Sequence, residues 1–234
     1  QALKATPEAR ALQHLFFAER ACAKVPGVDA KGAAPLDAVG VVGGGTMGRG
    51  IAMCFLDAGL PVTLVDVDDT AAAAAAAGID ATYRRSSAFK KGRLTEAALA
   101  AKLAKLAVAS DVTALGGADL VVEAIYEDLE AKRAVFARLD GACPTAVLAS
   151  NTSTLSIDAI ADAVADPTRV VGTHFFSPAN VMKLLENVRG ARTGDAAVAA
   201  AMALGSVKIK ILRRVRAESS RRPHRHRRDA CSMA

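Results

Sequence analysis

The chain has 234 residues, enough for one large α/β domain or for one domain with appendages. Hydrophobic residues make up 52% and aromatic residues only 4%, which argues against an aromatic platform that stacks single-stranded nucleic acid. The formal net charge is +6, but the excess positive charge lies in the C-terminal segment, residues 206–234.

The first predicted element is an amphipathic helix over residues 12–24, followed by a Pro- and Gly-containing linker over residues 25–35. Apolar strand-like runs and helical patterns then alternate, which predicts a Rossmann-like, doubly wound parallel sheet. Gly78 and Gly92 are expected to break the longest helical segment. Strands are expected at 36–42, 61–68, 106–112, 118–125, 145–151, 169–176 and 182–190, and helices at 46–58, 69–106, 127–140, 156–165 and 194–205.

The basic tail, residues 206–234, carries ten Lys or Arg residues against Glu218 and Asp229. It has no sustained apolar stripe, so we expect it to be disordered. Three interpretations of the tail stay open. The favoured one is an out-of-frame end, because Arg, Ala, Ser, Pro and His are the residues that GC-rich codons give when the reading frame is shifted. The others are a solvated tail and a polybasic arm that binds nucleic acid or an anionic membrane. The predicted organisation is therefore a connector helix and linker (1–35), a Rossmann domain (36–205) and the basic tail.

A glycine-rich segment, GGGTMG, lies where the first strand of the predicted domain meets its first helix. Gly43 permits a tight turn, Gly45 lets the backbone approach a pyrophosphate, and Gly48 lets the helix pack against the strand. The backbone of Met47 would contact the cofactor. In this context the motif predicts a dinucleotide held at a helix N-terminus.

Asp66 ends the second strand of the domain, 23 residues after Gly43. An acid at this place is expected to bind the hydroxyls of the adenosine ribose. The same carboxylate would repel a 2′-phosphate, and no Arg follows to neutralise one. NAD is therefore expected as the cofactor, in preference to NADP.

The four cysteines are scattered, with no CxxC pair and no Cys/His cluster at zinc-ligand spacing. This excludes a disulfide scaffold, and we expect no metal site. Because no disulfide pattern is visible, we expect a reducing compartment and therefore a cytoplasmic location. No apolar run approaches the roughly 20 residues that a membrane span requires.

Four segments together resemble the NAD-binding domain of L-3-hydroxyacyl-CoA dehydrogenases: GVVGGGTMGRGIA, VVEAIYEDLEAKR, SNTSTLSI and HFFSPANVMKLLENVRG. The resemblance covers about residues 36–205. FFAERACAK is similar to the connector that follows the enoyl-CoA hydratase half of multifunctional β-oxidation enzymes. The resemblance implies a fragment of such an enzyme, without the family's C-terminal helical domain and its GFxxNR motif. Ser177 stands where many single-function members have Asn.

The resemblance also assigns roles to individual residues. A single histidine is more often structural, but His174 and Glu186 match the family's catalytic pair, in which a carboxylate supports an imidazole that accepts the alcohol proton. Ser153 matches a serine near the substrate hydroxyl and the nicotinamide. Glu127 and Lys132 match positions that line the cofactor and CoA side of the cleft, although both would also suit an exposed helix face. Glu123 is a weaker candidate.

The expected activity is NAD-dependent oxidation of (3S)-3-hydroxyacyl-CoA to 3-oxoacyl-CoA in fatty-acid β-oxidation. One alternative is a truncated NAD-binding module with little or no turnover. Binding of nucleic acid through the basic tail is a third hypothesis, but residues 1–205 carry a net charge of −2 and no nucleic-acid-binding motif. We therefore expect a 3-hydroxyacyl-CoA substrate, no nucleic-acid partner, and a homo-oligomer or β-oxidation complex for the full-length protein.

Overall fold

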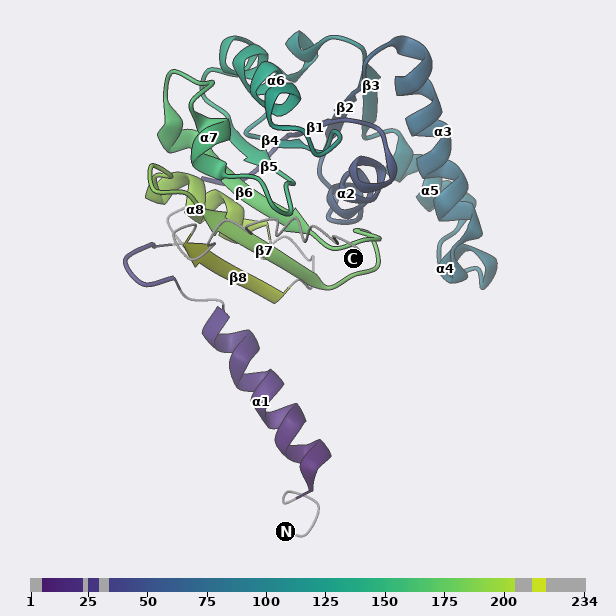
Figure 1. Cartoon of the computed structure of the whole chain (residues 1–234). Coiled ribbons are helices and arrows are strands. Elements are labelled where there is room, and N and C mark those ends of the chain that lie inside the picture. Colours follow the sequence, from purple (N-terminus) through teal and green to yellow (C-terminus); the bar gives the residue numbers. More distant parts are fainter. Residues whose placement is uncertain (1–5, 23–24, 30–33, 205–211, 218–234) are drawn as a thin grey trace, which may run out of the picture.

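The computed structural model describes residues 6–22, 25–29, 34–204 and 212–217. Its described strands form one eight-stranded sheet in the order β3-β2-β1-β4-β5-β6-β7-β8, flanked by helices (Figure 1). The strands are β1 (Val39–Val42), β2 (Val62–Val65), β3 (Leu106–Ala109), β4 (Leu120–Glu123), β5 (Val147–Ser150), β6 (Val170–Phe175), β7 (Leu184–Arg189) and β8 (Leu212–Ala217). This architecture confirms the predicted Rossmann-like α/β fold.

Helices follow the strands as the alternating sequence pattern predicts. They are α1 (Pro7–Cys22), α2 (Thr46–Asp57), α3 (Asp69–Arg85), α4 (Ser87–Lys90), α5 (Glu96–Leu103), α6 (Leu129–Ala142), α7 (Ile157–Ala161) and α8 (Asp195–Ala203), with short 3-10 helices η3 (Val112–Leu115) and η4 (Pro167–Arg169). Several begin at a side-chain cap. Asp68 accepts a hydrogen bond from the Ala71 amide at 2.7 Å, and Ser156 accepts one from Ala159 at 3.1 Å, so these caps satisfy backbone donors that the first turn leaves unpaired.

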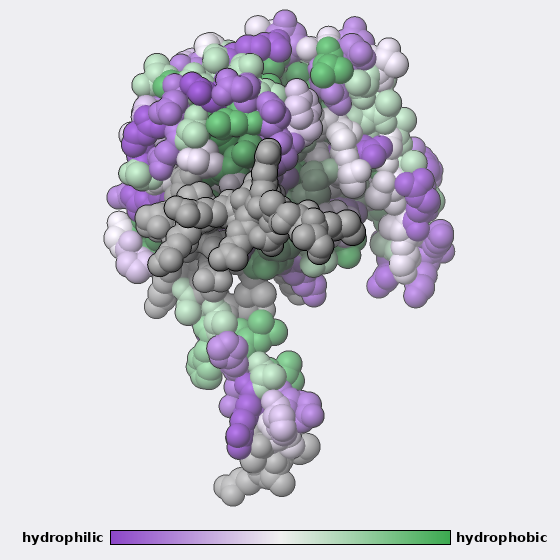
Figure 2. All heavy atoms as spheres, in the orientation of Figure 1, coloured by the Kyte–Doolittle hydropathy of each residue, from purple (hydrophilic) through white to green (hydrophobic). Residues whose placement is uncertain are grey.

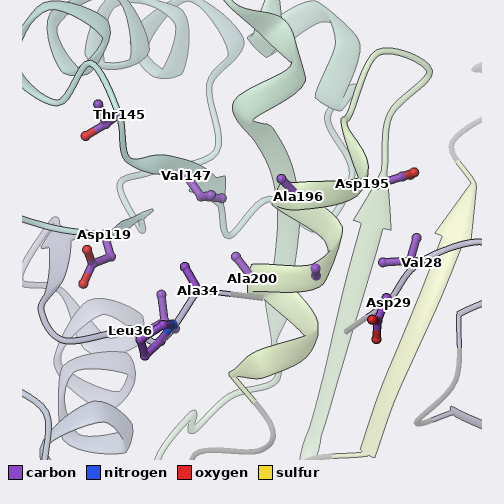
Figure 3. Close-up of a pocket in the computed structure, with 12 residues that line it drawn as sticks. Val28, Asp29, Ala34, Leu36, Asp119, Thr145, Val147, Asp195, Ala196 and Ala200 are labelled. Carbon is purple, nitrogen blue, oxygen red and sulfur yellow. The ribbon is translucent and has the colours of Figure 1, made fainter. Parts of the chain in front are cut away.

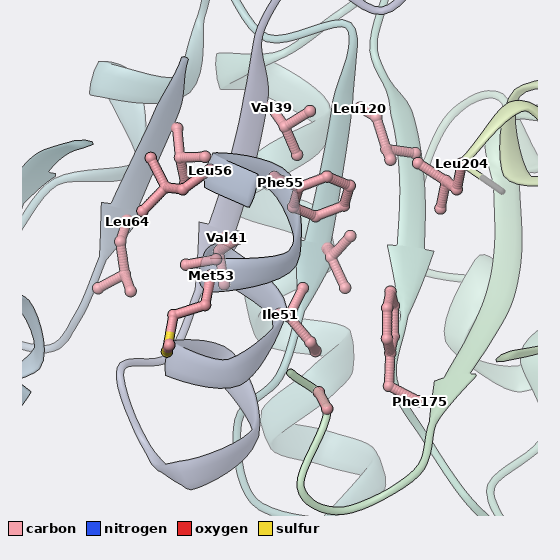
Figure 4. Close-up of a cluster of buried hydrophobic side chains, with 14 of the residues drawn as sticks. Val39, Val41, Ile51, Met53, Phe55, Leu56, Leu64, Leu120, Phe175 and Leu204 are labelled. Carbon is pink, nitrogen blue, oxygen red and sulfur yellow. The ribbon is translucent and has the colours of Figure 1, made fainter. Parts of the chain in front are cut away.

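Two apolar clusters hold the helices against opposite faces of the sheet. Residues of β1 and β4 are buried throughout, as expected for parallel strands covered on both sides. Val41 packs with Phe55 in the cluster under α2, α3, α5 and α8 (Figure 4), whereas Val121 packs with Phe136 under α6 and α7. Because each buried aromatic or aliphatic side chain contributes about 1.5–3 kcal/mol, these clusters anchor the strand ends that carry the site.

The strand predicted at residues 182–190 is β7, and it runs antiparallel to β6. The predicted parallel sheet therefore includes one antiparallel pairing, between β6 and β7. The reason is the connection, because the segment 176–183 is too short for the crossover of a dozen or more residues that a parallel partner requires.

Gly78 does not break the helical segment as predicted, since α3 continues through it. A Cβ atom at this position would lie 2.3 Å from the Nη1 atom of Arg49. The glycine therefore makes room for a side chain from α2 rather than ending a helix. Gly92, in contrast, follows α4 with a φ of +68° and does interrupt the segment, as predicted.

Strand β8 lies within the basic tail and pairs in parallel with β7. Six residues of the tail form this strand, because the open edge of β7 offers backbone donors and acceptors that need no apolar side-chain stripe to pair. The rest of the tail, residues 206–211 and 218–234, lies outside the described residues.

Helix α1 begins five residues earlier than predicted and projects from the body of the molecule (Figure 1). Its large apolar side chains include Leu12, Phe16 and Phe17, all of which are exposed. In Figure 2, hydrophobic residues cluster on the projecting helix. Among the described helices, none is both long and apolar enough to cross a bilayer.

Candidate active site

The carboxyl ends of the parallel strands lie at one edge of the sheet. Val42, at the end of β1, is in register with Val65 of β2 and with Glu123 of β4. Glu123 is in turn in register with Ser150 of β5. Doubly wound sheets bind their ligands at this edge. The register therefore brings together the glycine-rich segment, Asp66, Glu127 and residues 150–154, which we call the SNTST segment.

The glycine-rich segment forms a tight loop between β1 and α2. Gly43 has a φ of +98°, in the left-handed region that favours glycine. A Cβ atom at Gly48 would lie 1.7 Å from the Gly43 carbonyl oxygen, whereas one at Gly45 would meet nothing within 4 Å. Gly45 is the N-cap of α2 and makes no side-chain cap hydrogen bond. Open space beside an uncapped helix N-terminus fits a pyrophosphate, and Met47 packs on the apolar cluster beneath.

Asp66 lies at the end of β2 and is tied to this loop. Its Oδ2 atom accepts a hydrogen bond from the Gly44 amide at 2.8 Å, and its Oδ1 atom accepts one from the Val67 amide at 2.8 Å. The carboxylate is thus fixed beside the glycine loop, at the place where an adenosine ribose is expected.

His174 and Glu186 are direct cross-strand neighbours on β6 and β7. The His174 Nδ1 atom lies 3.1 Å from the Glu186 Oε2 atom, and both side chains are partly buried. The ring of Phe176 lies 4.6 Å from the imidazole ring, centroid to centroid. Because Nδ1 faces the carboxylate, Nε2 is the nitrogen left to exchange a proton with another group.

The Glu127 carboxylate accepts several hydrogen bonds from the SNTST segment. Its Oε1 atom accepts from the Thr152 hydroxyl at 2.6 Å, the Ser153 amide at 2.9 Å and the Thr154 amide at 3.1 Å. The Ser153 hydroxyl lies 3.2 Å from the same oxygen. Burial opposes ionisation of Glu127, but these hydrogen bonds and the nearby Lys132 outweigh it and lower its pKa to about 2.

Lys132 is fully buried. It therefore does not lie on an exposed helix face, which was the alternative to a cofactor role. Its Nζ atom lies 2.6 Å from Glu123 Oε1 and 3.4 Å from Glu127 Oε2. The second oxygen of Glu123 accepts a hydrogen bond from the Ser150 hydroxyl at 2.7 Å. The structure therefore joins Lys132 and Ser153 in one network through Glu127.

Asn151 links the SNTST segment to the strand that carries His174. Its Oδ1 atom accepts a hydrogen bond from the Phe175 amide at 2.8 Å. Sequence reasoning did not assign a site role to Ser150, Asn151 or Thr152. The available signal was a run of hydroxyl and amide side chains that begins at the last residue of a buried strand.

The described residues also form a pocket of about 570 Å³ at the opposite edge of the sheet (Figure 3). It is lined by Asp119 and Thr145, which precede β4 and β5, and by residues of α8 and the linker. None of the predicted site residues lines it. The loop and side chains at the carboxyl edge therefore define the candidate active site.

Comparisons with known proteins identify the family. The family described as "3-hydroxyacyl-CoA dehydrogenase, NAD binding domain" matches residues 38–211. The human peroxisomal bifunctional enzyme is 42% identical over 209 residues, which are 87% of this chain and 28% of that protein. The chain thus spans less than a third of this relative.

Solved structures agree with the sequence comparisons. The (S)-3-hydroxybutyryl-CoA dehydrogenase PaaH1 from Ralstonia eutropha is 35% identical with a TM-score of 0.74, covering 78% of this chain and 64% of that one. The dehydrogenase part of multifunctional enzyme 1 from C. elegans is 31% identical with a TM-score of 0.72, covering 86% of this chain and 48% of that one. The chain therefore belongs to the 3-hydroxyacyl-CoA dehydrogenase family and carries its NAD-binding domain.

Proposed function

We propose that the chain is the NAD-binding part of an enzyme that oxidises (3S)-3-hydroxyacyl-CoA to 3-oxoacyl-CoA in fatty-acid β-oxidation. The observation that carries the proposal is the His174–Glu186 pair, with Nδ1 and Oε2 3.1 Å apart, at the sheet edge where the glycine loop lies. The names of the relatives support this reaction class, since they are a bifunctional enzyme and hydroxyacyl-CoA dehydrogenases.

In this proposal His174 is the general base. Its Nε2 atom accepts the proton of the substrate hydroxyl, and the Glu186 carboxylate stabilises the imidazolium that forms. Ser153 orients the hydroxyl through its own Oγ atom. A bound nicotinamide supplies the acceptor for the hydride.

The cofactor side of the site follows from the loop geometry. Gly43, Gly45 and Gly48, with the backbone of Met47, would hold the pyrophosphate, and Asp66 would bind the ribose hydroxyls. Glu127, Lys132 and Ser153 would line the nicotinamide end. The open space at Gly45 and the fixed carboxylate of Asp66 support this assignment.

Turnover by this chain alone is a separate question, and a specific observation favours the alternative of an NAD-binding module with little or no turnover. Val181 and Met182, in the segment between β6 and β7, are 65% and 43% exposed. Exposed apolar side chains in the segment that connects the two strands of this pair suit contact with a covering domain. A full-length protein would then supply that domain, with the homo-oligomer or β-oxidation complex in which it works.

The decisive experiment is NADH-dependent reduction of acetoacetyl-CoA by the chain as given and by a version with a helical domain restored after Gly205. His174→Gln in the restored version is the matched control. The proposal expects NADH binding by both proteins, turnover by the restored version and loss of turnover in the control. Turnover that survives His174→Gln would refute the assigned base.

The compartment belongs to the same proposal. The scattered cysteines of the sequence favour a reducing, cytoplasmic location, whereas the human relative is named as peroxisomal. Fluorescence imaging of the tagged full-length protein distinguishes the two compartments.

A further inference from the structure

Strand β6 extends beyond the ladder that joins it to β5. The last pair of that ladder is Ser150 with Gly172, whereas β6 continues to Phe175. On its other side, β6 stays paired with β7 as far as Phe175. The His174–Glu186 pair therefore lies on a strand end that has a backbone ladder on one side only.

The chain of β5 turns away from the sheet directly after this ladder. Ser150 is the last residue of β5, and the Thr152 hydroxyl oxygen accepts a hydrogen bond from the Leu155 amide at 2.8 Å, which closes a turn. A continuing β5 would offer further backbone carbonyls to the amides of β6. The turn removes these acceptors, and a buried amide left without one costs about 1–3 kcal/mol.

The Asn151 side chain supplies an acceptor at this place. Its Oδ1 atom lies 2.8 Å from the Phe175 amide nitrogen, and only the oxygen of the side-chain amide can face an N–H donor. The backbone amide of Asn151 donates to the Glu123 carbonyl at 2.8 Å, so the residue is itself fixed on β4. Asn151 thus joins the end of β6 to the centre of the sheet, across the end of β5.

This hydrogen bond is made by the residue that follows His174 in the chain. The Phe175 side chain is buried in the apolar cluster of Figure 4, so packing holds its side chain while Asn151 holds its backbone. Strand ends open easily where backbone hydrogen bonds are few. The position of the imidazole opposite Glu186 therefore depends on how firmly the end of β6 is held.

We propose that Asn151 is a positioning residue for His174. Its side-chain carbonyl takes the place of a backbone acceptor that β5 no longer provides, and it holds the end of β6 so that the imidazole stays opposite Glu186. The catalytic consequence rests on the proposed function, whereas the fixing of the strand end does not.

The test replaces Asn151 by Leu, which has a similar shape and no acceptor. Asn151→Asp keeps an acceptor oxygen and is the conservative variant. Thr193→Val is the matched control, because the Thr193 hydroxyl donates to the Val170 carbonyl at 2.6 Å. This control removes a buried side-chain hydrogen bond to the same strand, but at the end far from His174. Thermal unfolding identifies which variants are folded.

The first readout is amide hydrogen exchange of Phe175, measured by NMR without cofactor. Asn151→Leu should speed this exchange by about 10- to 100-fold, because the amide loses its acceptor. Asn151→Asp and Thr193→Val should keep the amide protected. Unchanged exchange in folded Asn151→Leu would overturn the proposal. Where that variant does not fold, Asn151→Asp decides, since loss of protection despite the retained acceptor overturns the proposal and retained protection supports it.

The second readout reports on the imidazole itself. Nitrogen NMR of labelled histidine, assigned with His174→Gln, should show mainly the tautomer with its proton on Nδ1, because that nitrogen faces the Glu186 carboxylate. Asn151→Leu should lose this preference, whereas Thr193→Val should keep it. A merely structural loss of stability would affect the two variants alike. An unchanged tautomer in folded Asn151→Leu would show that Asn151 does not position His174.

Kinetics and NADH titration separate this inference from the proposed function. In the version with a helical domain restored after Gly205, Asn151→Leu should lower kcat by about 10²-fold, the usual effect of a misplacement of about 1 Å, and Thr193→Val should not. NADH binding should stay close to that of the wild type. Weaker NADH binding with an unchanged His174 tautomer would place the role of Asn151 at the cofactor and overturn the proposal.

A restored wild type that fails to turn over would contradict the proposed function. The exchange of the Phe175 amide and the tautomer of His174 would still decide whether Asn151 holds the end of β6.

Discussion

At the scale of single residues, Asp66 combines two tasks, because its carboxylate holds the Gly44 amide and faces the expected ribose site. Asp66→Ala should weaken NADH binding by about 1–3 kcal/mol, as for a lost hydrogen bond to a charged group. Fluorescence titration measures this, with the exposed Asp69→Ala on α3 as the control. Equal affinity of the wild type for NADH and NADPH would contradict the role of Asp66 in cofactor choice.

The His174–Glu186 pair supports a second prediction at this scale. In a version that turns over, each single variant, His174→Gln or Glu186→Gln, should lower kcat by about 10²–10⁴-fold, the usual contribution of a positioned acid–base group. The double variant should lose much less than the product of the two effects, because the groups act as one unit. Fully additive losses in steady-state kinetics would show that the two residues do not cooperate.

At the scale of elements, two glycines at the junction of β1 and α2 are expected to have different roles, one in stability and one in cofactor binding. Gly48→Ala places a Cβ atom against the Gly43 carbonyl oxygen, so it should destabilise the fold by about 1–3 kcal/mol, as overpacking usually does. Gly45→Ala meets open space, so it should leave the melting temperature unchanged and weaken NADH binding. Equal melting temperatures for the two variants would show that the close approach at Gly48 is unimportant.

The loop after β5 supports a prediction of pH dependence. The pKa of Glu127 is lowered from 4.5 to about 2, so its ionised form is favoured in the folded state. Its stabilising contribution is therefore complete above about pH 4.5 and is lost as the pH falls toward 2. The difference in melting temperature between the wild type and Glu127→Gln should shrink over that interval. A constant difference down to pH 2 would exclude this linkage.

At the scale of the whole molecule, Leu12, Phe16 and Phe17 of α1 are exposed, as are Val181 and Met182 between β6 and β7. Exposed apolar surface of this kind promotes association. We predict that the chain as given aggregates more readily than the version with a helical domain restored after Gly205. Light scattering at matched concentrations measures the difference, and a monodisperse chain with the full rate of the restored version would refute the prediction.

The sequence by itself determined the features that depend on short-range order. Apolar runs and helical periodicity located the parallel strands and their helices, and the spacing of Gly43, Gly45 and Gly48 predicted the loop because backbone sterics act between near neighbours. The roles of His174, Glu186 and Ser153 came from the family resemblance of their segments. They remain predictions that kinetics must test.

The tertiary structure alone decided which distant groups meet. The antiparallel pairing of β7 sets Glu186 opposite His174, and the packing of α6 buries Lys132 between two carboxylates. The side chain of Arg49 explains why Gly78 lies inside a helix. Each of these contacts joins residues from different elements, so it depends on strand register and helix packing, which local sequence patterns do not encode.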